Sequence, residues 1–589
     1  MRKQTKLVAV LSTAALLAIG ASMTSFAAQG WAEEDGTWVY YDRNGDRVTD
    51  KWAKSGNNWY YLDSDGEMAI DTLIEDGDNY YYVDINGVMA SNQWVAIENE
   101  DAGDDDEPEN YWYYFQSNGK ALTNGNNSNV ALKTINGKKY AFDEEGKMLF
   151  GWVAKDSAER IDNTDGDGFK TGDYYFGDEN DGAMTVGWLQ MDITYDEATS
   201  DYEFAPVFND DEDQTRWFYF QSNGKKVKAD GARESKDKTI NGKKYSFDQY
   251  GAMTAEWSLD REDADNLATP LRAHSDNTTA TGNSVNAQYA KQWRYFNSVE
   301  DGSRVSKGWF KVVAAEWLNN DKFDDDEDSW YYADGSGNLY AGEFKTIKGK
   351  KYAFRDDGRM VDSLKFIKDT GSGLIVAADD GSLPYATEDE FNTSAPEFEY
   401  QGYGCYYFGD GNDGSMKTNK ISVDIDGDKF NFYFQKSGSK KGAGLTGEKD
   451  KKYYQSGKLL AAGKDEKYQV VSKILGSTTE KGYKKLDDVD AFKTALTSSN
   501  YVDYSSATDA VKASKLASVG VNKKGEDIKD LILIKDANGV EGKGQSSDNF
   551  FLVNTSGKVI DNKTKSTDGN DYVYVTAKGG KILAIYSED

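Results

Sequence analysis

The sequence predicts a mainly β protein: an elongated solenoid of stacked β-hairpin repeats, followed by a small α+β C-terminal segment. The 589 residues include 39 Tyr, 26 Phe, 14 Trp and 58 Gly but only 5 Pro. Aromatic residues make up 13% of a chain that is only 38% hydrophobic, so aliphatic residues are too few for one large core. Aromatic-rich strands and glycine-rich turns recur along the chain. Because a lone hairpin is marginally stable, each must stack on its neighbours.

The repeat is an aromatic triplet followed by a polar turn that ends in glycine. The first three triplets begin at Trp38, Trp59 and Tyr80, each 21 residues after the last. The same pattern returns, with insertions, at Trp112, Tyr174, Trp217, Trp293, Trp330, Tyr406, Phe432 and Lys452. This regularity establishes an internal repeat, which decides the fold class.

A shorter variant, Lys-Thr-Ile-x-Gly-Lys-Lys-Tyr, starts at Lys133, Lys238 and Lys345. The three starts are 105 and 107 residues apart, which indicates that a larger block was duplicated.

Each unit has the chemistry of a β-hairpin. Aromatic triplets favour strands, and pairs such as Asn86-Gly87 supply the positive φ that a tight turn needs. Strand alternation places Trp59 and Tyr61 on one face and Tyr60 on the other. We expect one set to fill the interior with methionines such as Met68, and the other set to lie at the junction with the next hairpin.

The N-terminus is typical of an export signal. Arg2, Lys3 and Lys6 precede an apolar stretch that is too short for a membrane span, and small residues follow it. We therefore expect residues 1–27 to be a signal peptide, and the mature chain to be secreted without a transmembrane segment. Residues 28–462 form the aromatic repeats with acidic insertions, and residues 463–589 form the C-terminal segment.

Composition excludes several classes of function. The net charge of −32 argues against binding to nucleic acid. Cys405 and His274 are the only residues of their types, so zinc sites, Cys-His dyads and a Ser-His-Asp triad are poorly supported. The acidic runs 162–167 and 424–428 do not complete a calcium-binding loop. We expect no catalytic residue, no metal and no cofactor.

Aromatic rings in this number suit two kinds of ligand. A cage of two or three rings can hold a quaternary ammonium by cation–π attraction, and flat rings also suit the apolar faces of sugars. A strongly acidic chain attracts ammonium groups but is repelled by the phosphates of a wall polymer.

The repeat motif resembles that of a known family. The stretch from Lys51-Trp52 through Trp59-Tyr60-Tyr61 to Gly66 and Met68 is similar to the cell-wall-binding repeat of choline-binding and glucan-binding proteins. The Ile-x-Gly-Lys-Lys-Tyr units resemble the related repeats of clostridial toxin C-termini. The resemblance covers roughly residues 31–460 and implies non-covalent attachment to choline-decorated teichoic acids or to glycans.

In this family, ligands would sit between consecutive hairpins. The resemblance groups Trp38 and Tyr40 with Trp52, then Trp59 with Tyr61, and then Tyr80 and Tyr82 with Trp94. The full set of expected ligand-binding residues is Trp38, Tyr40, Trp52, Trp59, Tyr61, Tyr80, Tyr82, Trp94, Trp112, Tyr114, Trp152 and Trp188.

Some units depart from the family pattern. Leu73 stands where a strand-end Trp is expected, and the variant units place Lys139, Lys244 and Lys351 at aromatic positions. We do not expect choline cages at those junctions.

The C-terminal segment predicts a helix after Asp487-Asp488 and a second one over 506–518. It is either a cap for the repeat array or the carrier of a specific activity. Two alternatives to a binding protein therefore remain: a cell-wall or polysaccharide hydrolase with its catalysis in this segment, and an adhesin for host glycans. Choline, glucan and peptidoglycan all remain candidate ligands.

Overall fold

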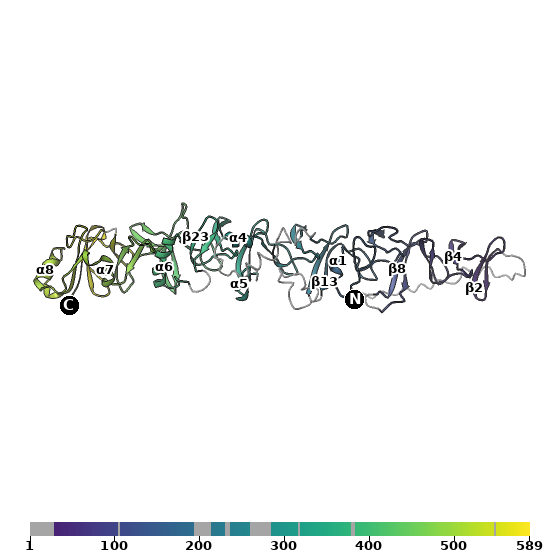
Figure 1. Cartoon of the computed structure of the whole chain (residues 1–589), viewed down its shortest axis with the longest axis horizontal. Coiled ribbons are helices and arrows are strands. Elements are labelled where there is room, and N and C mark those ends of the chain that lie inside the picture. The colour runs from purple at the N-terminus through teal and green to yellow at the C-terminus, as the bar shows by residue number, and fades with distance from the viewer. Residues whose placement is uncertain are drawn as a thin grey trace. The chain divides into compact units, whose positions relative to one another are not determined.

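The computed structural model describes residues 29–103, 107–193, 214–229, 236–259, 284–315, 318–378, 383–546 and 549–588 (Figure 1). The expected signal peptide and His274 lie outside these residues. Within the described ranges, no helix is long and apolar enough to cross a bilayer.

The mainly β prediction is confirmed, and most sheets are single antiparallel hairpins. The chain divides into two compact units, Met1–Ala264 with Phe296–Arg304, and Asp265–Tyr295 with Val305–Asp589. In the first part of the chain the strands are β1 (Gly30–Glu34), β2 (Thr37–Tyr41), β3 (Lys51–Ser55), β4 (Asn58–Leu62), β5 (Thr72–Asp76), β6 (Asn79–Val83), β7 (Gln93–Glu98), β8 (Asn110–Phe115), β9 (Lys133–Ile135), β10 (Lys138–Tyr140), β11 (Trp152–Val153), β12 (Tyr174–Tyr175), β13 (Gly187–Ile193), β14 (Gln214–Phe220), β15 (Lys236–Ile240), β16 (Lys243–Phe247) and β17 (Glu256–Leu259).

The remaining repeat strands are β18 (Trp293–Phe296), β19 (Gly308–Val312), β20 (Ser329–Ala333), β21 (Glu343–Ile347), β22 (Lys350–Phe354), β23 (Leu364–Asp369), β24 (Leu374–Val376), β25 (Gly404–Tyr407), β26 (Asn419–Ile425), β27 (Asp428–Phe434), β28 (Gly447–Lys449), β29 (Lys452–Gln455) and β30 (Lys458–Leu459). Helices inserted among the repeats are α1 (Gly168–Thr171), α4 (Ser284–Ala290), α5 (Asn320–Asp324) and α6 (Glu388–Gln401).

In several repeats the turn after the triplet is fixed by one aspartate. The backbone N–H groups of Asp65 and Glu67 donate to Oδ1 of Asp63 over 3.0 and 2.8 Å. Gly66 closes the turn with φ +74°, a conformation that favours glycine. The same pair of bonds forms at Asp42, Asp84, Asp248 and Asp334. The turn chemistry of the repeat is therefore an Asx turn closed by glycine.

Consecutive hairpins stack through one backbone hydrogen bond. The N–H of Met68 donates to the carbonyl of Trp38 over 2.7 Å, and Met89 repeats the bond to Trp59 over 2.9 Å. Later units preserve it between Met148 and Trp112, Met253 and Trp217, and Met360 and Trp330. In Figure 1, β2, β4 and β8 follow one another in chain order along the first unit. The stacking that a solenoid requires is thus present within each unit.

The C-terminal segment consists of two further sheets with two α-helices. Its strands are β31 (Tyr468–Lys473), β32 (Tyr483–Leu486), β33 (Tyr501–Asp503), β34 (Ile528–Ile534), β35 (Phe550–Asn554), β36 (Lys563–Thr567), β37 (Tyr572–Thr576) and β38 (Ile582–Glu588). The predicted helices form as α7 (Val489–Leu496) and α8 (Asp509–Ala517), and three short 3-10 turns cover Ser498–Asn500, Gly525–Asp527 and Lys578–Gly580. Asp488 caps α7, accepting the N–H of Ala491 over 2.7 Å.

This segment continues the stacking of the repeats. Phe551 packs on Tyr453 of the last hairpin, with ring centroids 4.2 Å apart. Asn554 forms the same Asx turn as the repeats, and a Cβ atom on its Gly557 would lie 2.8 Å from Leu459. The C-terminal segment therefore covers the exposed face of the last hairpin, as a cap does.

Candidate functional site: the aromatic junctions

Three rings meet where one hairpin stacks on the next. Trp52 lies directly across the β3–β4 ladder from Tyr61, and their ring centroids are 5.1 Å apart. Tyr81, from the following hairpin, approaches the same indole to 5.0 Å. The two tyrosine rings are tilted by 59–64° from the indole plane, so they pack against it at an angle rather than in a flat stack. We call this set the Trp52 junction.

The arrangement recurs in both units with a constant composition. Each junction has a tryptophan on the first strand, the aromatic ring across the ladder from it, and a ring from the next hairpin. The others are Trp31–Tyr40–Tyr60, Trp94–Tyr114–Tyr140, Trp152–Tyr175–Phe218, Trp188–Tyr219–Tyr245 and Trp309–Tyr332–Tyr352.

Strand alternation explains which residue supplies the third ring. In the β4 triplet, Tyr60 is buried while Trp59 and Tyr61 are more exposed, as the alternation predicts. Tyr60 does not only fill the interior, because its ring also packs against Trp31 of the preceding hairpin at 5.2 Å. The middle aromatic residue of one triplet therefore completes the junction of the hairpin before it.

The Trp52 junction is the most accessible of the set. Trp52, Tyr61 and Tyr81 are all only partly buried, whereas the third ring of the other five junctions is buried. In this junction all three rings are therefore partly open to solvent.

A carboxylate stands beside this junction. The indole N–H of Trp52 donates to Oδ2 of Asp76 over 3.1 Å. Burial raises the pKa of Tyr81, and the charge of Asp76 raises it further. Burial and nearby carboxylates, Asp76 among them, also raise the pKa of Tyr61. The rings thus lie in a negative field, which favours a cation between them.

The structure brings together only some of the residues that sequence reasoning selected. Tyr40, Trp52, Tyr61, Trp94, Tyr114 and Trp188 each belong to a junction. Trp38 and Trp112 are half-buried beside a junction. Trp59 is 40% exposed and lies across the ladder from Lys54, and the Nζ atom of Lys54 lies 5.6 Å from the centroid of the Trp59 ring.

The grouping of Tyr80 and Tyr82 with Trp94 differs from the observed packing. Tyr80 and Tyr82 pack with Leu73 against Tyr113, while Trp94 contacts Tyr114 and Tyr140. The reason is that each tryptophan faces forward along the array, toward the hairpin that follows it.

Sequence reasoning missed the third ring of every junction. These third rings are Tyr60, Tyr81, Tyr140, Phe218, Tyr245 and Tyr352. The expected ligand-binding set also left out five first or second rings: Trp31, Tyr175, Tyr219, Trp309 and Tyr332. The available pattern was the equal spacing from Trp31 to Tyr60 and from Trp52 to Tyr81, which insertions lengthen in the later junctions. In the variant units the third ring is the tyrosine of Lys-Lys-Tyr, which completes the junction before it.

The variant units lack rings for the junction that would follow. Ala141, Ser246 and Ala353 occupy the third position of their triplets, where the other units have an aromatic ring. Ser246 lies across the ladder from Asp237, and Ala353 lies across from Phe344. The Nζ atom of Lys351 lies 4.5 Å from the ring centroid of Phe344. No aromatic trio follows these three units in the described residues.

The Trp152 junction is closed by the chain itself. Trp152 is 2% exposed, and the buried Lys226 places its Nζ 4.8 Å from the indole centroid while donating to the carbonyl of Phe169. The internal ammonium occupies the position that an external cation would need. We therefore leave Trp152 out of the proposed ligand site.

Two other expectations concern metals and thiols. Among the described residues, no group of three or more Asp, Glu, His or Cys side chains is placed to hold a metal ion. Cys405 is buried and unpaired, and burial raises the pKa of its thiol well above the ordinary value. Such a thiol is a poor nucleophile.

Comparison with known proteins gives the family of the repeats. A family model described as a choline-binding repeat matches residues 28–72 and 48–94, and one described as a cell wall binding repeat matches residues 109–121. No curated protein sequence matches the chain.

Solved structures with similar arrangements come from Streptococcus pneumoniae. The modular autolysin LytC is 18% identical, with a TM-score of 0.27, and the match covers 58% of this chain and 55% of the autolysin. Choline binding protein F is 17% identical, with a TM-score of 0.20, and the match covers 74% of this chain and 100% of that one. This chain therefore spans about half the length of the autolysin.

The matched segments contain the first two junctions and the triplet that begins at Trp112. Residues 28–94 and 109–121 thus match the choline-binding repeat and the cell wall binding repeat, respectively.

Proposed function

We propose that this protein is a secreted, non-catalytic surface protein that attaches to choline-bearing wall polymers through its aromatic junctions. The trimethylammonium group of choline would lie against the exposed ring faces of a junction. Each ring contact of this kind contributes about 0.5–2 kcal/mol. Several junctions on one chain would add avidity without any new contact.

The observation that carries the proposal is the Trp52 junction. It combines three partly exposed rings with a carboxylate that is hydrogen-bonded to the central indole. A neutral sugar can stack on the rings and donate a hydroxyl hydrogen bond to the carboxylate, but only a quaternary ammonium carries a full charge that is attracted to both. The junction therefore favours choline over glucan as its ligand.

The C-terminal segment supports a binding role rather than the hydrolase alternative. Its carboxylates with shifted pKa values are explained by local contacts: the ammonium of Lys515 and the Tyr504 hydroxyl lower the pKa of Glu541, and burial raises that of Asp568. Its two helices and two sheets pack against each other and against the last hairpin. We assign it the role of a cap.

The test is adsorption of the purified chain to isolated walls that carry choline and to walls in which ethanolamine replaces choline. We expect retention on choline walls only, and release by millimolar free choline. Equal retention on both walls, unaffected by choline, would move the assignment to a glycan ligand. Measurement of released reducing sugar in the same samples tests the hydrolase alternative, and we expect none.

A further inference from the structure

Lys458 is a buried lysine of the second unit whose ammonium contacts two side chains of one helix. It lies on β30, and its side chain is 4% exposed. Its Nζ atom donates to Oε1 of Glu388 over 2.6 Å and to Oδ1 of Asn392 over 2.8 Å. Glu388 and Asn392 are four residues apart on α6, so they lie on the same face of that helix. An amine, a carboxamide and a carboxylate therefore meet at one point.

Aromatic rings border this group. Nζ of Lys458 lies 4.4 Å from the ring centroid of Phe430 and 5.6 Å from that of Phe391. Phe391 is buried in a hydrophobic core, and Phe430 packs against the same core. Asn392 is itself partly buried. An apolar site of this kind restricts the access of water to the reacting groups.

The site holds the amine and the carboxyl group in useful protonation states. Burial lowers the pKa of the Lys458 ammonium from 10.5 to about 8, although its hydrogen bond to Glu388 acts in the opposite direction. Burial raises the pKa of Glu388, but the hydrogen bond and charge of Lys458, together with Lys485 at 3.2 Å, outweigh it and hold that pKa below its ordinary value. Glu388 is thus a carboxylate at neutral pH, placed to accept a proton from Lys458. The neutral amine that results is a nucleophile.

The amine also lies close to the amide carbon of Asn392. A C=O bond is about 1.2 Å long, so Cγ of Asn392 is at most about 4.0 Å from Nζ of Lys458. Reacting atoms in a near-attack arrangement are roughly 3–3.5 Å apart. Rotation about the side-chain bonds of Lys458 covers the remaining distance, since it moves Nζ without moving the backbone.

Contacts away from these three groups hold α6 against the same sheet. Oγ of Ser456 donates to the carbonyl of Ala395 over 3.4 Å. Oγ1 of Thr446 donates to Oε2 of Glu399 over 2.9 Å. The helix is therefore positioned beside Lys458 without relying on the ion pair alone.

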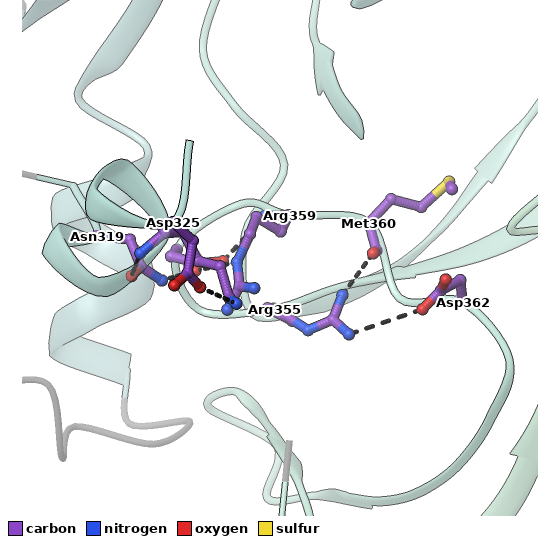
Figure 2. Close-up of polar contacts among 8 residues, drawn as sticks. Asn319, Asp325, Arg355, Arg359, Met360 and Asp362 are labelled. Atoms are coloured by element: carbon purple, nitrogen blue, oxygen red, sulfur yellow. Dashed lines mark hydrogen bonds and ion pairs between the residues drawn. The ribbon is translucent and has the colours of Figure 1, made fainter. Parts of the chain in front are cut away.

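A buried arginine elsewhere in the second unit shows why the type of cation matters. Arg355 lines a pocket beside Trp330, where Nη1 donates to the carbonyl of Met360 and Nη2 lies 3.9 Å from Asp362, as the dashed lines in Figure 2 show. A guanidinium is not deprotonated in proteins, so these contacts orient and balance a charge. They provide no nucleophile.

Two lysines share only part of the arrangement around Lys458. Lys512 is buried, but its ammonium donates to two backbone carbonyls. Lys238 donates to the side-chain amide of Gln221 over 3.1 Å, yet it is only half-buried, and no carboxylate pairs with it in the described part of the chain. Both lysines therefore serve as internal controls.

We propose that Lys458 and Asn392 form an intramolecular amide bond, with Glu388 as the group that transfers protons. Glu388 accepts a proton from the ammonium, and the neutral Nζ attacks Cγ of Asn392. The Cγ–Nδ2 bond then breaks, and two protons in all pass from Nζ to Nδ2, which leaves as an ammonium ion. Glu388 ends as a carboxylate. One C–N bond forms and one breaks, so the step needs no oxidant or co-reactant.

The bond ties α6 to the central strand of a five-stranded sheet. The order of that sheet is β26-β27-β30-β29-β28, and the two linked residues are 66 positions apart. A covalent link that closes a long loop lowers the entropy of the unfolded chain. A chain with Cys405 as its single cysteine cannot form an internal disulfide, and an amide bond also resists reduction.

The test is the intact mass of the purified full chain in denaturant, compared with that of Asn392→Ala. After correction for the substitution, we expect the unchanged chain to be lighter than the variant by one ammonia molecule. Tandem mass spectrometry of a tryptic digest should find the peptide with Asn392 joined to the peptide with Lys458. Glu388→Ala and Lys458→Arg should both lack the link, since one loses the base and the other the nucleophile. The peptides with Lys512 and Lys238 should be found unlinked.

The unchanged chain decides the outcome even where a variant fails to fold. Its full sequence mass, with the peptides of Asn392 and Lys458 found separately, would overturn the inference. Loss of ammonia that maps to any other residue would also overturn it. A link that forms to the same extent in Glu388→Ala would contradict the proton-transfer role of Glu388.

Discussion

A Cβ atom built on Gly87 would lie 2.8 Å from both Cε and Sδ of Met68, the methionine of the preceding hairpin. The same contact joins Gly119 to Met89 and Gly302 to Met253. Turn glycine and methionine are therefore one packing unit. The glycine supplies both the positive φ of its turn and the space that the methionine fills.

This contact predicts the effect of a methyl group at the turn. We expect Gly87→Ala to destabilise the chain by about 2–4 kcal/mol, because it adds both backbone strain and overpacking. Gly77→Ala is the matched control, since Gly77 has φ +60° but nothing within 4 Å of its Cβ position; we expect it to cost about 1 kcal/mol. Urea unfolding of both variants measures the difference, and equal costs would show that the methionine contact contributes nothing.

The Asx turn predicts that two aspartates of the same loop differ in their contribution to the free energy of unfolding. Asp63→Ala removes the acceptor of two backbone N–H groups and should cost about 1–2 kcal/mol. Asp65, in the same turn, is exposed, and Asp65→Ala should change the free energy of unfolding by less than about 0.5 kcal/mol. Thermal unfolding of the two variants decides whether the aspartate at the start of the turn matters.

The buried Lys226 predicts how stability depends on pH. Burial lowers the pKa of its ammonium from 10.5 to about 7 in the folded chain. Between pH 7 and 10.5 the unfolded chain binds the proton and the folded chain does not, so this residue makes stability rise with pH across that window. Below pH 7 the full cost of burying the charge remains.

Lys226→Met should therefore stabilise the chain most below pH 7, and the gain should shrink steadily toward pH 10. Unfolding curves of both proteins at a series of pH values give the difference directly. A gain that does not vary with pH would mean that Lys226 titrates normally in the folded state.

The sequence predicts the hairpins well because their determinants are local. An aspartate, a glycine three residues later and alternating aromatics specify one turn and two strand faces, as the Asp63 turn and the Tyr60 burial show. The helix after Asp488 was predictable for the same reason, since its cap lies within three residues of the group it satisfies.

The junctions depend on contacts between hairpins, and local pattern does not determine which face meets which. Trp94 packs on Tyr140 rather than on Tyr82 because each hairpin presents its tryptophan to the hairpin that follows it. The closure of Trp152 by Lys226 joins residues 74 positions apart, across an inserted helix. The pocket beside Trp330 similarly assembles side chains from three hairpins and an insertion.

The most direct test of the account is a calorimetric titration of choline into the unchanged chain, Trp52→Ala and Tyr81→Leu. Tyr400→Ala, which removes an exposed aromatic ring from α6 outside the junctions, is the control. We expect the unchanged chain to bind choline in the millimolar range. Both junction variants should lose the tightest site, because Trp52 and Tyr81 come from different hairpins but contact the same ligand, and the control should bind choline as the unchanged chain does. Choline binding that survives in both junction variants would contradict the account.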